Sequence, residues 1–548
     1  MALSGAQGPK GGAMAGFSLL PFVLLLASAA GLASPRVLPG VFDLAVLGAG
    51  PTGITAAVKA AQLGHRAIVI DDPGSGAKLQ VGGPSGLFSK ALRDVSKRLN
   101  VQTLRSMGLR DSAIWSQASD LCRDIALVET QNTVRRLQRA GVPRIQGCAA
   151  FEELQPDGTV LLRCTMRDGS ALMVNAKRAL VATGSKAWAA PGVPLDGRRI
   201  FDSDSIKRLT YLPTSVVITG SGIIAIEFAK IFATLGAKVL LLVRGSSLDS
   251  ALEKFGFDAA FGPEVQEALL ASGIKLRFDT EVVPGSFVVP GSLSAPVRMR
   301  LRTKPDLCSA CAPPGDEEVC CDLYMLAAGR DPNSASLNLG AVGATLDARG
   351  ALAVDRQLCA VDGVVWGAGD VLGPPSLAST GIQQATAAIA AMFGTADMEG
   401  AGLDYRPAAL VGNPYRYPVG IWTTPEISYF GQSPKQAARS GVDIVEGIAR
   451  YTATLRGHVN RCTTGTLKLV VESRGGAVIG VFIFGDEACE LIHYGMEIVN
   501  SGRTVFDVRD TCFAAVTYHE LFTVAADDAI RKLGEQGSGA KIVARGLC

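Results

Sequence analysis

The 548-residue chain has little charge imbalance, few aromatic residues and almost no long apolar runs. Its formal net charge is only +3 at pH 7, so we expect no extended basic surface for nucleic acid. Aromatic residues make up 6% of the chain, within a composition that is otherwise that of an ordinary globular protein. Beyond the N-terminal segment, no stretch is long and apolar enough to span a bilayer. The length exceeds what one core supports and predicts roughly three or four domains.

The N-terminal segment contains the one long apolar run. Lys10 precedes an apolar stretch over residues 17–33, which ends in small residues and includes an Ala-Ser-Ala site at 27–29. This pattern is typical of a cleavable signal peptide or organelle leader, so we expect residues 1–34 to direct the chain to the secretory pathway or to an organelle reached through it. A signal anchor and an apolar leader without a targeting role are the alternatives. Membrane contact is expected only through an uncleaved leader.

The first of two glycine-rich turns is Gly48-Ala-Gly-Pro-Thr-Gly53. It follows a buried-strand pattern at 42–47 and opens a helix of small residues, and the next strand ends at Asp71. Glycines in such a turn let the backbone approach a pyrophosphate, and the helix N-terminus supplies N–H groups and a positive dipole end. A carboxylate at the end of the second strand can accept hydrogen bonds from a ribose. The residues predicted to bind this dinucleotide are Gly48, Gly50, Gly53 and Asp71.

A second unit repeats the pattern. A strand at 215–219 leads to Gly220-Ser-Gly-Ile-Ile-Ala225. The strand after the next helix, at 238–243, ends without an acid and is followed by Arg244. An acid there binds the 2′-hydroxyl of NAD, whereas an Arg suits the 2′-phosphate of NADP, so NADP(H) is favoured. If Arg244 is only a solvated loop residue, both NAD(H) and NADP(H) are accepted. The residues predicted to bind the second dinucleotide are Gly220, Gly222, Ala225 and Arg244.

Further motifs follow in a defined order. Ala182-Thr-Gly184 closes a strand, Ala327-Ala-Gly-Arg-Asp-Pro-Asn333 follows another, and Val365-Trp-Gly-Ala-Gly-Asp370 precedes an Ala-rich helix. With both glycine-rich turns, these motifs resemble the pyridine-nucleotide:disulfide oxidoreductases, over about residues 41–535. The resemblance implies FAD at the first turn and NAD(P)H at the second, with hydride passing between their rings. It adds these FAD-binding residues: Thr183, Gly184, Arg330, Gly369 and Asp370.

The resemblance also implies the architecture. We expect an α/β fold with two Rossmann-like dinucleotide-binding domains and a C-terminal α+β dimerisation domain, which makes a homodimer the expected assembly. The stretches Gly420–Ser428 and Glu490–Ile498 resemble the soluble pyridine-nucleotide transhydrogenases within this family. The expected divisions are a leader at 1–34, an FAD domain at 41–190 and 326–405, an NAD(P)H domain at 191–325, an interface domain at 414–535 and a tail at 536–548. The terminal Cys548 is expected to be inert.

Two reactive groups of the family are missing. Aligned on Ser89-Lys90, the positions of the redox disulfide hold Val81 and Gly86, which can neither attack a disulfide nor form a thiolate. In the family motif His-Pro-Thr-x-x-Glu, the His position is Ala515 and the Glu position is Glu520.

The neighbouring His519 is out of register with that motif. We expect it to be an ordinary interface or surface residue, with an acid/base role as the alternative. Because both the dithiol and the His are lost, a disulfide reductase is not expected, short of one that uses relocated cysteines.

Lys90 and Glu227 match the Lys and Glu that form an ion pair beside the flavin N5 in this family, and they are the predicted catalytic residues. A positive charge at that place stabilises reduced flavin. The alternative is that Lys90 only extends from a surface helix. The leading prediction is an FAD-dependent, transhydrogenase-like NAD(P)H oxidoreductase that moves hydride from NADPH to NAD⁺ or another non-disulfide acceptor. The alternatives are an NAD(P)H dehydrogenase with a quinone or other small acceptor, and a diverged flavoprotein that serves as a structural or binding subunit.

Four of the twelve cysteines cluster in one loop, at Cys308, Cys311, Cys320 and Cys321. Alternation over 297–301 and 319–326 predicts an antiparallel hairpin with this loop at its tip. Adjacent cysteines on a strand point to opposite faces, which disfavours a single zinc site, so no metal is predicted. A disulfide at the loop tip, free thiols and, least favoured, a metal site remain the alternatives.

Overall fold

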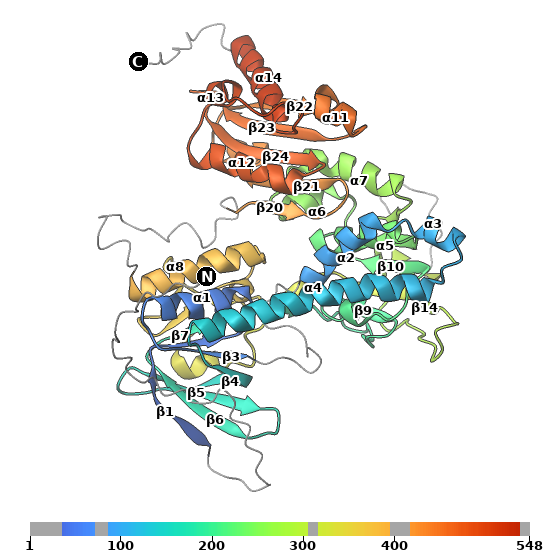
Figure 1. Cartoon of the computed structure of the whole chain (residues 1–548). Helices are drawn as coiled ribbons and strands as arrows, with labels where there is room; N and C mark the ends of the chain where they lie inside the picture. Colours follow the sequence, from blue (N-terminus) through green and yellow to red (C-terminus); the bar gives the residue numbers. More distant parts are fainter. Residues whose placement is uncertain (1–34, 72–85, 305–315, 395–416, 537–548) are drawn as a thin grey trace, which may run out of the picture.

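The computed structural model describes residues 35–71, 86–304, 316–394 and 417–536. Figure 1 shows two sheet-containing lobes side by side, bridged by the long helix α4 (Asp111–Arg139), and a C-terminal lobe that stands on the second of them. This arrangement confirms the predicted α/β class with a C-terminal α+β domain. The leader and the tail with Cys548 lie outside the described residues. Within the described ranges, no helix is long and apolar enough to cross a membrane.

The first lobe is built on a nine-stranded sheet in the order β1-β6-β5-β4-β3-β2-β7-β19-β18. Strand β2 lies between β3 and β7 and pairs with both in parallel, and all four of its residues are buried. Because both faces of such a strand are covered by other layers, it is apolar throughout. The bounds are β1 Arg36–Phe42, β2 Leu44–Leu47, β3 Ala67–Asp71, β4 Arg144–Leu154, β5 Val160–Met166, β6 Ala171–Ala176, β7 Ala179–Val181, β18 Cys359–Val361 and β19 Val365–Gly367.

Helices α1 (Pro51–Gln62) and α8 (Ala378–Phe393) lie together beside this sheet (Figure 1). Their close approach depends on small residues, since a Cβ placed on Gly381 would lie 2.2 Å from the Thr52 Oγ1. The predicted helix of small residues begins at Pro51, because Pro suits the first helical position.

The second lobe contains a five-stranded sheet in the order β12-β11-β10-β16-β9, in which every neighbouring pair is parallel. Strand β10 matches the predicted strand at 215–219. The bounds are β9 Ile200–Asp202, β10 Ser215–Thr219, β11 Lys238–Leu242, β12 Lys275–Arg277 and β16 Leu323–Leu326, with helices α5 Ile223–Thr234, α6 Asp249–Lys254 and α7 Gly262–Ala271.

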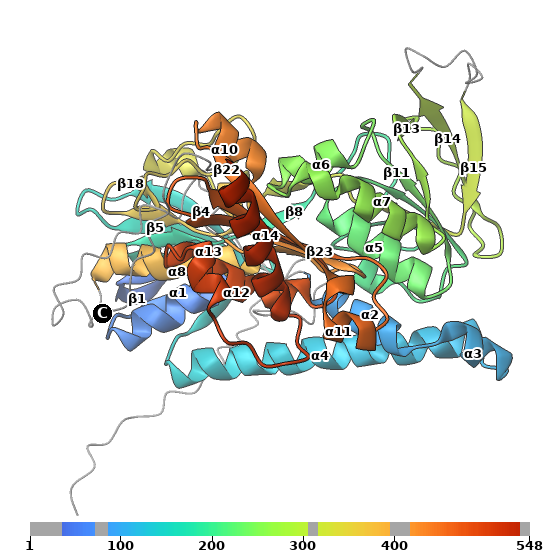
Figure 2. The ribbon, with the colours of Figure 1, turned by 90° about the horizontal axis from the view of Figure 1, so that it is seen from above.

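A three-stranded antiparallel sheet extends from the second lobe, as Figure 2 shows. Its strands are β13 Thr280–Val282, β14 Val297–Thr303 and β15 Glu317–Cys321. The predicted hairpin is therefore present, but the prediction of one strand over 319–326 was wrong. Asp322 accepts backbone N–H groups from Thr214 and Ser215, and the chain after it enters the parallel sheet as β16. Alternation alone did not reveal the change of sheet, because residues 323–326 are buried on both faces.

The C-terminal lobe is a five-stranded antiparallel sheet in the order β20-β21-β24-β23-β22. Helices α12, α13 and α14 pack with its core on one side. Its other side shares a core with the second lobe, where Tyr429 meets Phe257 with ring centroids 4.8 Å apart. The bounds are β20 Val419–Ile421, β21 Glu426–Gly431, β22 Ile444–Arg450, β23 Thr466–Glu472, β24 Val478–Gly485, α10 Pro434–Arg439, α11 Leu455–Val459, α12 Ala488–Asn500, α13 Val505–Arg509 and α14 Glu520–Gln536.

Helices α2 (Leu87–Arg98), α3 (Val101–Ser106) and the first half of α4 join the core of the second lobe. Leu92 and Trp115 are buried there with Phe232 of α5, and the Trp115 Nε1 donates to the Leu209 carbonyl over 2.9 Å. These helices follow the first nucleotide-binding unit in the sequence, yet they pack against the second. This packing places α2 beside α5.

Candidate active site and nucleotide-binding turns

The first glycine-rich turn connects β2 to α1 in a shape that only glycine permits at two positions. Gly48 has a φ of +110°, and a Cβ on it would lie 2.3 Å from the Ala182 carbonyl oxygen. A Cβ on Gly53 would lie 2.0 Å from the carbonyl oxygen of Gly48. Gly50 differs, because a Cβ there would meet no atom of the described residues within 4 Å. Gly48 and Gly53 therefore serve the packing of the turn, and Gly50 leaves the N-terminus of α1 open to a phosphate.

Asp71 ends β3 next to this turn. Its Oδ1 accepts the Ala49 N–H over 2.9 Å, and its Oδ2 accepts the Arg144 Nη2 over 3.0 Å. The Arg144 Nε is buried and has no hydrogen-bond partner among the described residues. A held carboxylate beside an unsatisfied N–H donor fits the ribose and adenine end of FAD.

The other residues predicted to bind FAD form one hydrogen-bonded set. Asp370 accepts the Ser185 Oγ over 2.7 Å, and that oxygen accepts the Arg330 Nε over 2.8 Å. Arg330 also forms an ion pair with Asp204 at 3.0 Å. Arg330 thus ties strand β17 (Arg330–Pro332) to its antiparallel partner β8 (Ser185–Ala187).

The loop before β8 is held in the same way. Thr183 donates its hydroxyl to the Asn333 carbonyl over 2.7 Å, and the Asn333 N–H donates to the Gly184 carbonyl over 2.9 Å. Gly184 has a φ of +71°, a conformation that favours glycine. Thr183, Gly184, Arg330 and Asp370, which lie far apart in the sequence, are therefore brought together at one side of the first sheet.

Gly369 connects this set to the first turn. Its φ is +82°, its N–H donates to the Gln384 Oε1 over 2.8 Å, and a Cβ on it would lie 2.7 Å from the Thr52 Oγ1. The Thr380 Oγ1, on α8, is buried without a partner among the described residues. A buried hydroxyl without a protein partner, on the helix that packs against α1, is a group that bound FAD would satisfy.

The second glycine-rich turn connects β10 to α5 with the same architecture. Gly220 has a φ of +145°, and a Cβ on it would lie 2.3 Å from the Ala327 carbonyl oxygen. Ala225 is fully buried under the turn, and Arg244 is exposed just after β11. Gly222 directly precedes α5, and the free N–H groups at the start of this helix suit a pyrophosphate. The turn therefore has the residues that a second dinucleotide requires.

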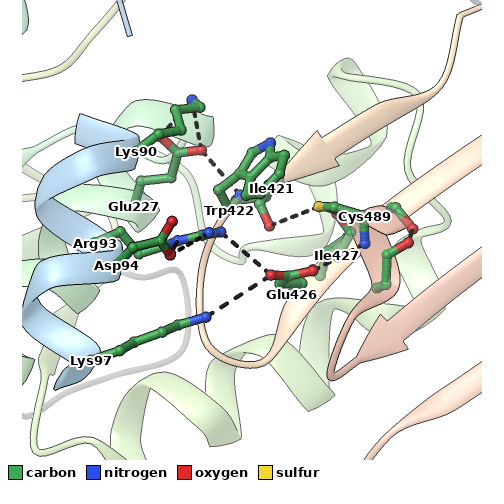
Figure 3. Close-up of polar contacts among 12 residues, drawn as sticks. Lys90, Arg93, Asp94, Lys97, Glu227, Ile421, Trp422, Glu426, Ile427 and Cys489 are labelled. Atoms are coloured by element: carbon green, nitrogen blue, oxygen red, sulfur yellow. Dashed lines mark hydrogen bonds and ion pairs between the residues drawn. The ribbon is translucent and has the colours of Figure 1, made fainter. Parts of the chain in front are cut away.

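Lys90 and Glu227 meet between α2 and α5, as Figure 3 shows. The Lys90 Nζ lies 3.3 Å from Oε1 and 3.2 Å from Oε2 of Glu227. The Glu227 side chain is only 3% exposed, whereas that of Lys90 is 38% exposed. The Glu227 Oε1 also accepts the backbone N–H of Trp422, just after β20, over 3.0 Å. Three segments that are distant in the sequence therefore hold one carboxylate.

The loop that carries Trp422 is held by a second set of charges (Figure 3). The Arg93 guanidinium lies over the Trp422 ring, 4.4 Å from its centroid, and its Nη1 lies 3.4 Å from the Glu426 Oε1. The Glu426 Oε2 accepts the Cys489 N–H over 3.0 Å. Arg93 and Trp422 were not among the predicted site residues. Trp422 lies in the stretch Gly420–Ser428 that carries the resemblance, but its contact with Arg93 spans more than three hundred residues of chain and leaves no local pattern.

The positions of the missing reactive groups lie in different surroundings. Gly86 precedes α2, and a Cβ on it would lie 3.4 Å from the Lys90 Nζ, so the lost thiol position adjoins the ion pair. Val81 lies outside the described residues. Ala515 is exposed, and His519 is half-buried with Tyr494 and Phe522, where burial lowers the pKa of its imidazole.

The cysteines of the hairpin face opposite ways, as predicted. Cys320 is exposed and Cys321 is buried, and burial raises the pKa of the Cys321 thiol to about 12. Such a thiol carries no reactive thiolate near neutral pH. Cys308 and Cys311 lie outside the described residues. In the part of the chain that the structure describes, no group of three or more His, Cys, Asp or Glu residues could hold a metal ion.

Two glycine-rich turns that each open a helix, and an ion pair between α2 and α5 that the C-terminal lobe also contacts, are typical of a flavin- and nicotinamide-dependent oxidoreductase. The family model described as pyridine nucleotide-disulphide oxidoreductase matches residues 42–391, and the model of its dimerisation domain matches residues 417–526. The chain belongs to this family. It is an FAD-dependent pyridine-nucleotide oxidoreductase whose cofactors are FAD and NAD(P).

Individual relatives span almost the whole chain. Soluble pyridine nucleotide transhydrogenases of Colwellia psychrerythraea and Marinobacter nauticus are 29% and 30% identical to it, each over 90% of this chain and over 98% and 99% of their own length. Two solved structures share the fold at 89% coverage of this chain and 99% of theirs. They are a Cu(II) complex of the HOCl-induced flavoprotein disulfide reductase RclA from Escherichia coli (TM-score 0.71, 21% identity) and LpdA from Mycobacterium tuberculosis (TM-score 0.72, 22% identity).

Proposed function

We propose that the protein moves hydride from NADPH to NAD⁺ or another acceptor that is not a disulfide. The observation that carries this proposal is the Lys90–Glu227 pair, which is held by contacts from three segments of the chain. The adjoining position, where the family has a redox cysteine, is Gly86, so no thiol can pass electrons to a disulfide there. The relatives named as transhydrogenases support the same reaction class. Bound FAD would supply the two-electron carrier between donor and acceptor.

The residues of the ion pair have separate tasks in this proposal. Glu227 is almost fully buried and accepts both the Lys90 ammonium and the Trp422 N–H, so its carboxylate sets the direction of the lysine side chain. Lys90 places a positive charge where negative charge develops on a reduced ring, and a fixed charge there needs no reorganisation during the reaction. We assign the binding of FAD to the residues of the first turn, Asp71 and Asp370.

NADP(H) is the proposed nucleotide at the second turn. Arg244 is exposed just beyond β11, and the strand end has no carboxylate to bind a 2′-hydroxyl. A guanidinium at this position pairs with the 2′-phosphate. Replacing it by Ala should reduce the preference for NADPH over NADH about tenfold or more, without affecting the rate at saturation.

The test is rapid mixing of the purified yellow protein with NADPH and with NADH, followed by its flavin absorbance. We expect NADPH to bleach the flavin, and we expect Lys90→Met to slow that step about 100-fold. Lys97→Met is the matched control, since Lys97 lies on the same helix, is also 38% exposed and faces Glu426 at 4.0 Å. No bleaching with either nucleotide would rule out the proposal. Reoxidation by NAD⁺ and by a set of quinones would then identify the acceptor class.

We also propose that the protein is a homodimer. The C-terminal lobe matches a dimerisation domain, and it exposes Leu455 and Val459 of α11. Leu121, Ile125 and Val128 form a further exposed apolar stripe along α4. Light scattering of the purified protein should give twice the chain mass, and a monomer at micromolar concentration would contradict this proposal.

For the leader we retain the proposal of targeting to the secretory pathway or to an organelle reached through it. N-terminal sequencing of the mature protein should find a start near residue 34. An intact Met1 in the mature chain would contradict cleavage.

A further inference from the structure

The two glycine-rich turns differ in one contact. At the first turn a Cβ placed on Gly50 would meet nothing within 4 Å in the part of the chain that the structure describes. At the second turn a Cβ placed on the corresponding Gly222 would lie 3.0 Å from Cζ and 3.2 Å from Cε2 of Phe255. The middle glycine of this motif is the point at which a dinucleotide pyrophosphate approaches the backbone. The Phe255 ring therefore lies in the space that the pyrophosphate of a nicotinamide dinucleotide uses.

The backbone of Phe255 is held firmly. Phe255 follows α6, and its carbonyl accepts the Tyr429 Oη from the C-terminal lobe over 2.7 Å. Tyr429 is completely buried and stacks on Phe482 with centroids 5.5 Å apart. Gly256 has a φ of +89°, and a Cβ on it would lie 2.1 Å from the Tyr429 Oη, so the chain at this point has no room to shift toward the C-terminal lobe.

The ring of Phe255 is held much less than its backbone. The residue is 44% exposed, which leaves room for the side chain to turn about its own torsions. An apolar ring over a helix N-terminus neither accepts its N–H groups nor complements its positive end. The ring thus covers the turn but leaves its N–H groups without an acceptor. An anionic pyrophosphate would cover the turn and also accept hydrogen bonds from these N–H groups.

We propose that Phe255 is a gate on the nicotinamide-dinucleotide site: its ring covers Gly222 and must turn away before a pyrophosphate reaches α5. This proposal rests on the proposed function, since it concerns the nucleotide site of that reaction. Binding then carries the cost of opening, so the apparent affinity equals the affinity of the open form multiplied by the fraction of molecules in which the ring is turned away. The gate acts on binding and not on the Lys90–Glu227 pair.

The experiment measures binding of NADP⁺ to the full-length oxidised flavoprotein by calorimetry, because NADP⁺ cannot reduce the flavin. Phe255→Ala should tighten NADP⁺ binding about 5- to 10-fold, as expected when a gate closed in most molecules is removed. Phe255→Leu, which keeps a smaller apolar side chain, should give a smaller gain. Leu270→Ala is the control, since Leu270 lies on α7 of the same lobe, is 51% exposed and should leave the affinity unchanged.

Stopped-flow reduction by NADPH supplies the second readout. Phe255→Ala should lower the NADPH concentration needed for half-maximal rate and leave the limiting rate as in the parent protein. Unchanged NADP⁺ binding in both Phe255 variants would overturn the gate, because it would show that the ring does not obstruct the nucleotide. Weaker binding in both would also overturn it, because it would show that the ring contacts the bound nucleotide. If NADP⁺ binds but NADPH reduces no flavin, the proposed function fails while the gate is still judged by the calorimetry.

Discussion

Lys230 lies one helical turn from Glu227 on α5, yet it has very different surroundings. Glu227 is held by an ammonium and a backbone N–H, whereas the Lys230 Nζ donates to the hydroxyl of Ser272. No carboxylate forms an ion pair with Lys230 within the described ranges. Burial therefore lowers the pKa of Lys230 from 10.5 to about 8.

Lys230→Met should stabilise the protein at pH 7 by on the order of 1–3 kcal/mol. Below pH 8 the lysine is charged in both the folded and unfolded states, so its burial lowers the free energy of unfolding. Between about 8 and 10.5 the unfolded state binds the extra proton, and the parent protein gains stability as pH rises. The advantage of the variant should therefore shrink from pH 7 to pH 9.5 in thermal melts.

Lys238→Met is the control for this comparison, because Lys238 is exposed on β11. Its melting temperature should differ from that of the parent by the same small amount at both values of pH. A Lys230→Met advantage that stays constant with pH would show that the lysine keeps an ordinary pKa.

At the scale of elements, the local patterns predicted most of the nucleotide-binding units. Strand β10 has the predicted bounds, and α5 begins at Ile223, since glycine-turn geometry lets the helix start directly after Gly222. Local patterns failed where a neighbour from elsewhere in the chain decided the structure. Strand β15 ends at Cys321 because Asp322 binds the start of β10, and Trp422 meets Glu227 across 195 residues. Neither contact leaves a periodic signal in the sequence.

The first glycine-rich turn gives a prediction at this scale. Gly50→Ala should fold normally but lose FAD affinity about tenfold, because its methyl group would point into open space where the pyrophosphate approaches. Gly53→Ala should instead destabilise the first lobe by about 1–3 kcal/mol or more, since its Cβ would lie 2.0 Å from a carbonyl oxygen. Flavin content after dialysis and the melting temperature of the apoprotein separate the two effects.

Gly340→Ala serves as the control, because its Cβ would also meet nothing within 4 Å but lies away from the turn. It should change neither quantity. Equal flavin retention in Gly50→Ala and Gly340→Ala would show that the space beside Gly50 is not the phosphate site.

At the scale of the whole molecule, the C-terminal lobe contacts both Glu227 and Phe255 of the second lobe. It supplies the Trp422 N–H to Glu227 and the Tyr429 hydroxyl to the Phe255 carbonyl. The contacts that hold the C-terminal lobe against the second lobe therefore also keep these site residues in position. One buried charged link between these lobes is Lys468 of β23, whose Nζ lies 2.6 Å from Asp258 of the second lobe and 2.7 Å from Glu446.

Lys468 is almost fully buried, with a side chain that is 7% exposed. Although burial opposes its charge, hydrogen bonds to Asp258 and Glu446 raise its pKa above 10.5. A raised pKa in the folded state means that the lysine contributes stability from neutral pH up to about 10.5 and that this contribution is lost as pH rises through the folded pKa. The link between the lobes is thus intact across the physiological range.

Lys468→Met should lower the free energy of unfolding by about 3–5 kcal/mol at pH 7, because it leaves the buried Asp258 carboxylate without its partner. Lys435→Met is the matched control: Lys435 also links the C-terminal lobe to the second lobe, through Glu253 at 2.5 Å, but it is 56% exposed and should cost less than about 1 kcal/mol. Chemical denaturation of the holoprotein measures both.

If the loosened lobe also withdraws the Trp422 N–H from Glu227, Lys468→Met should slow flavin reduction by NADPH under conditions in which it is still folded, and Lys435→Met should not. Equal stability of the two variants would show that the buried pair does not hold the lobes together.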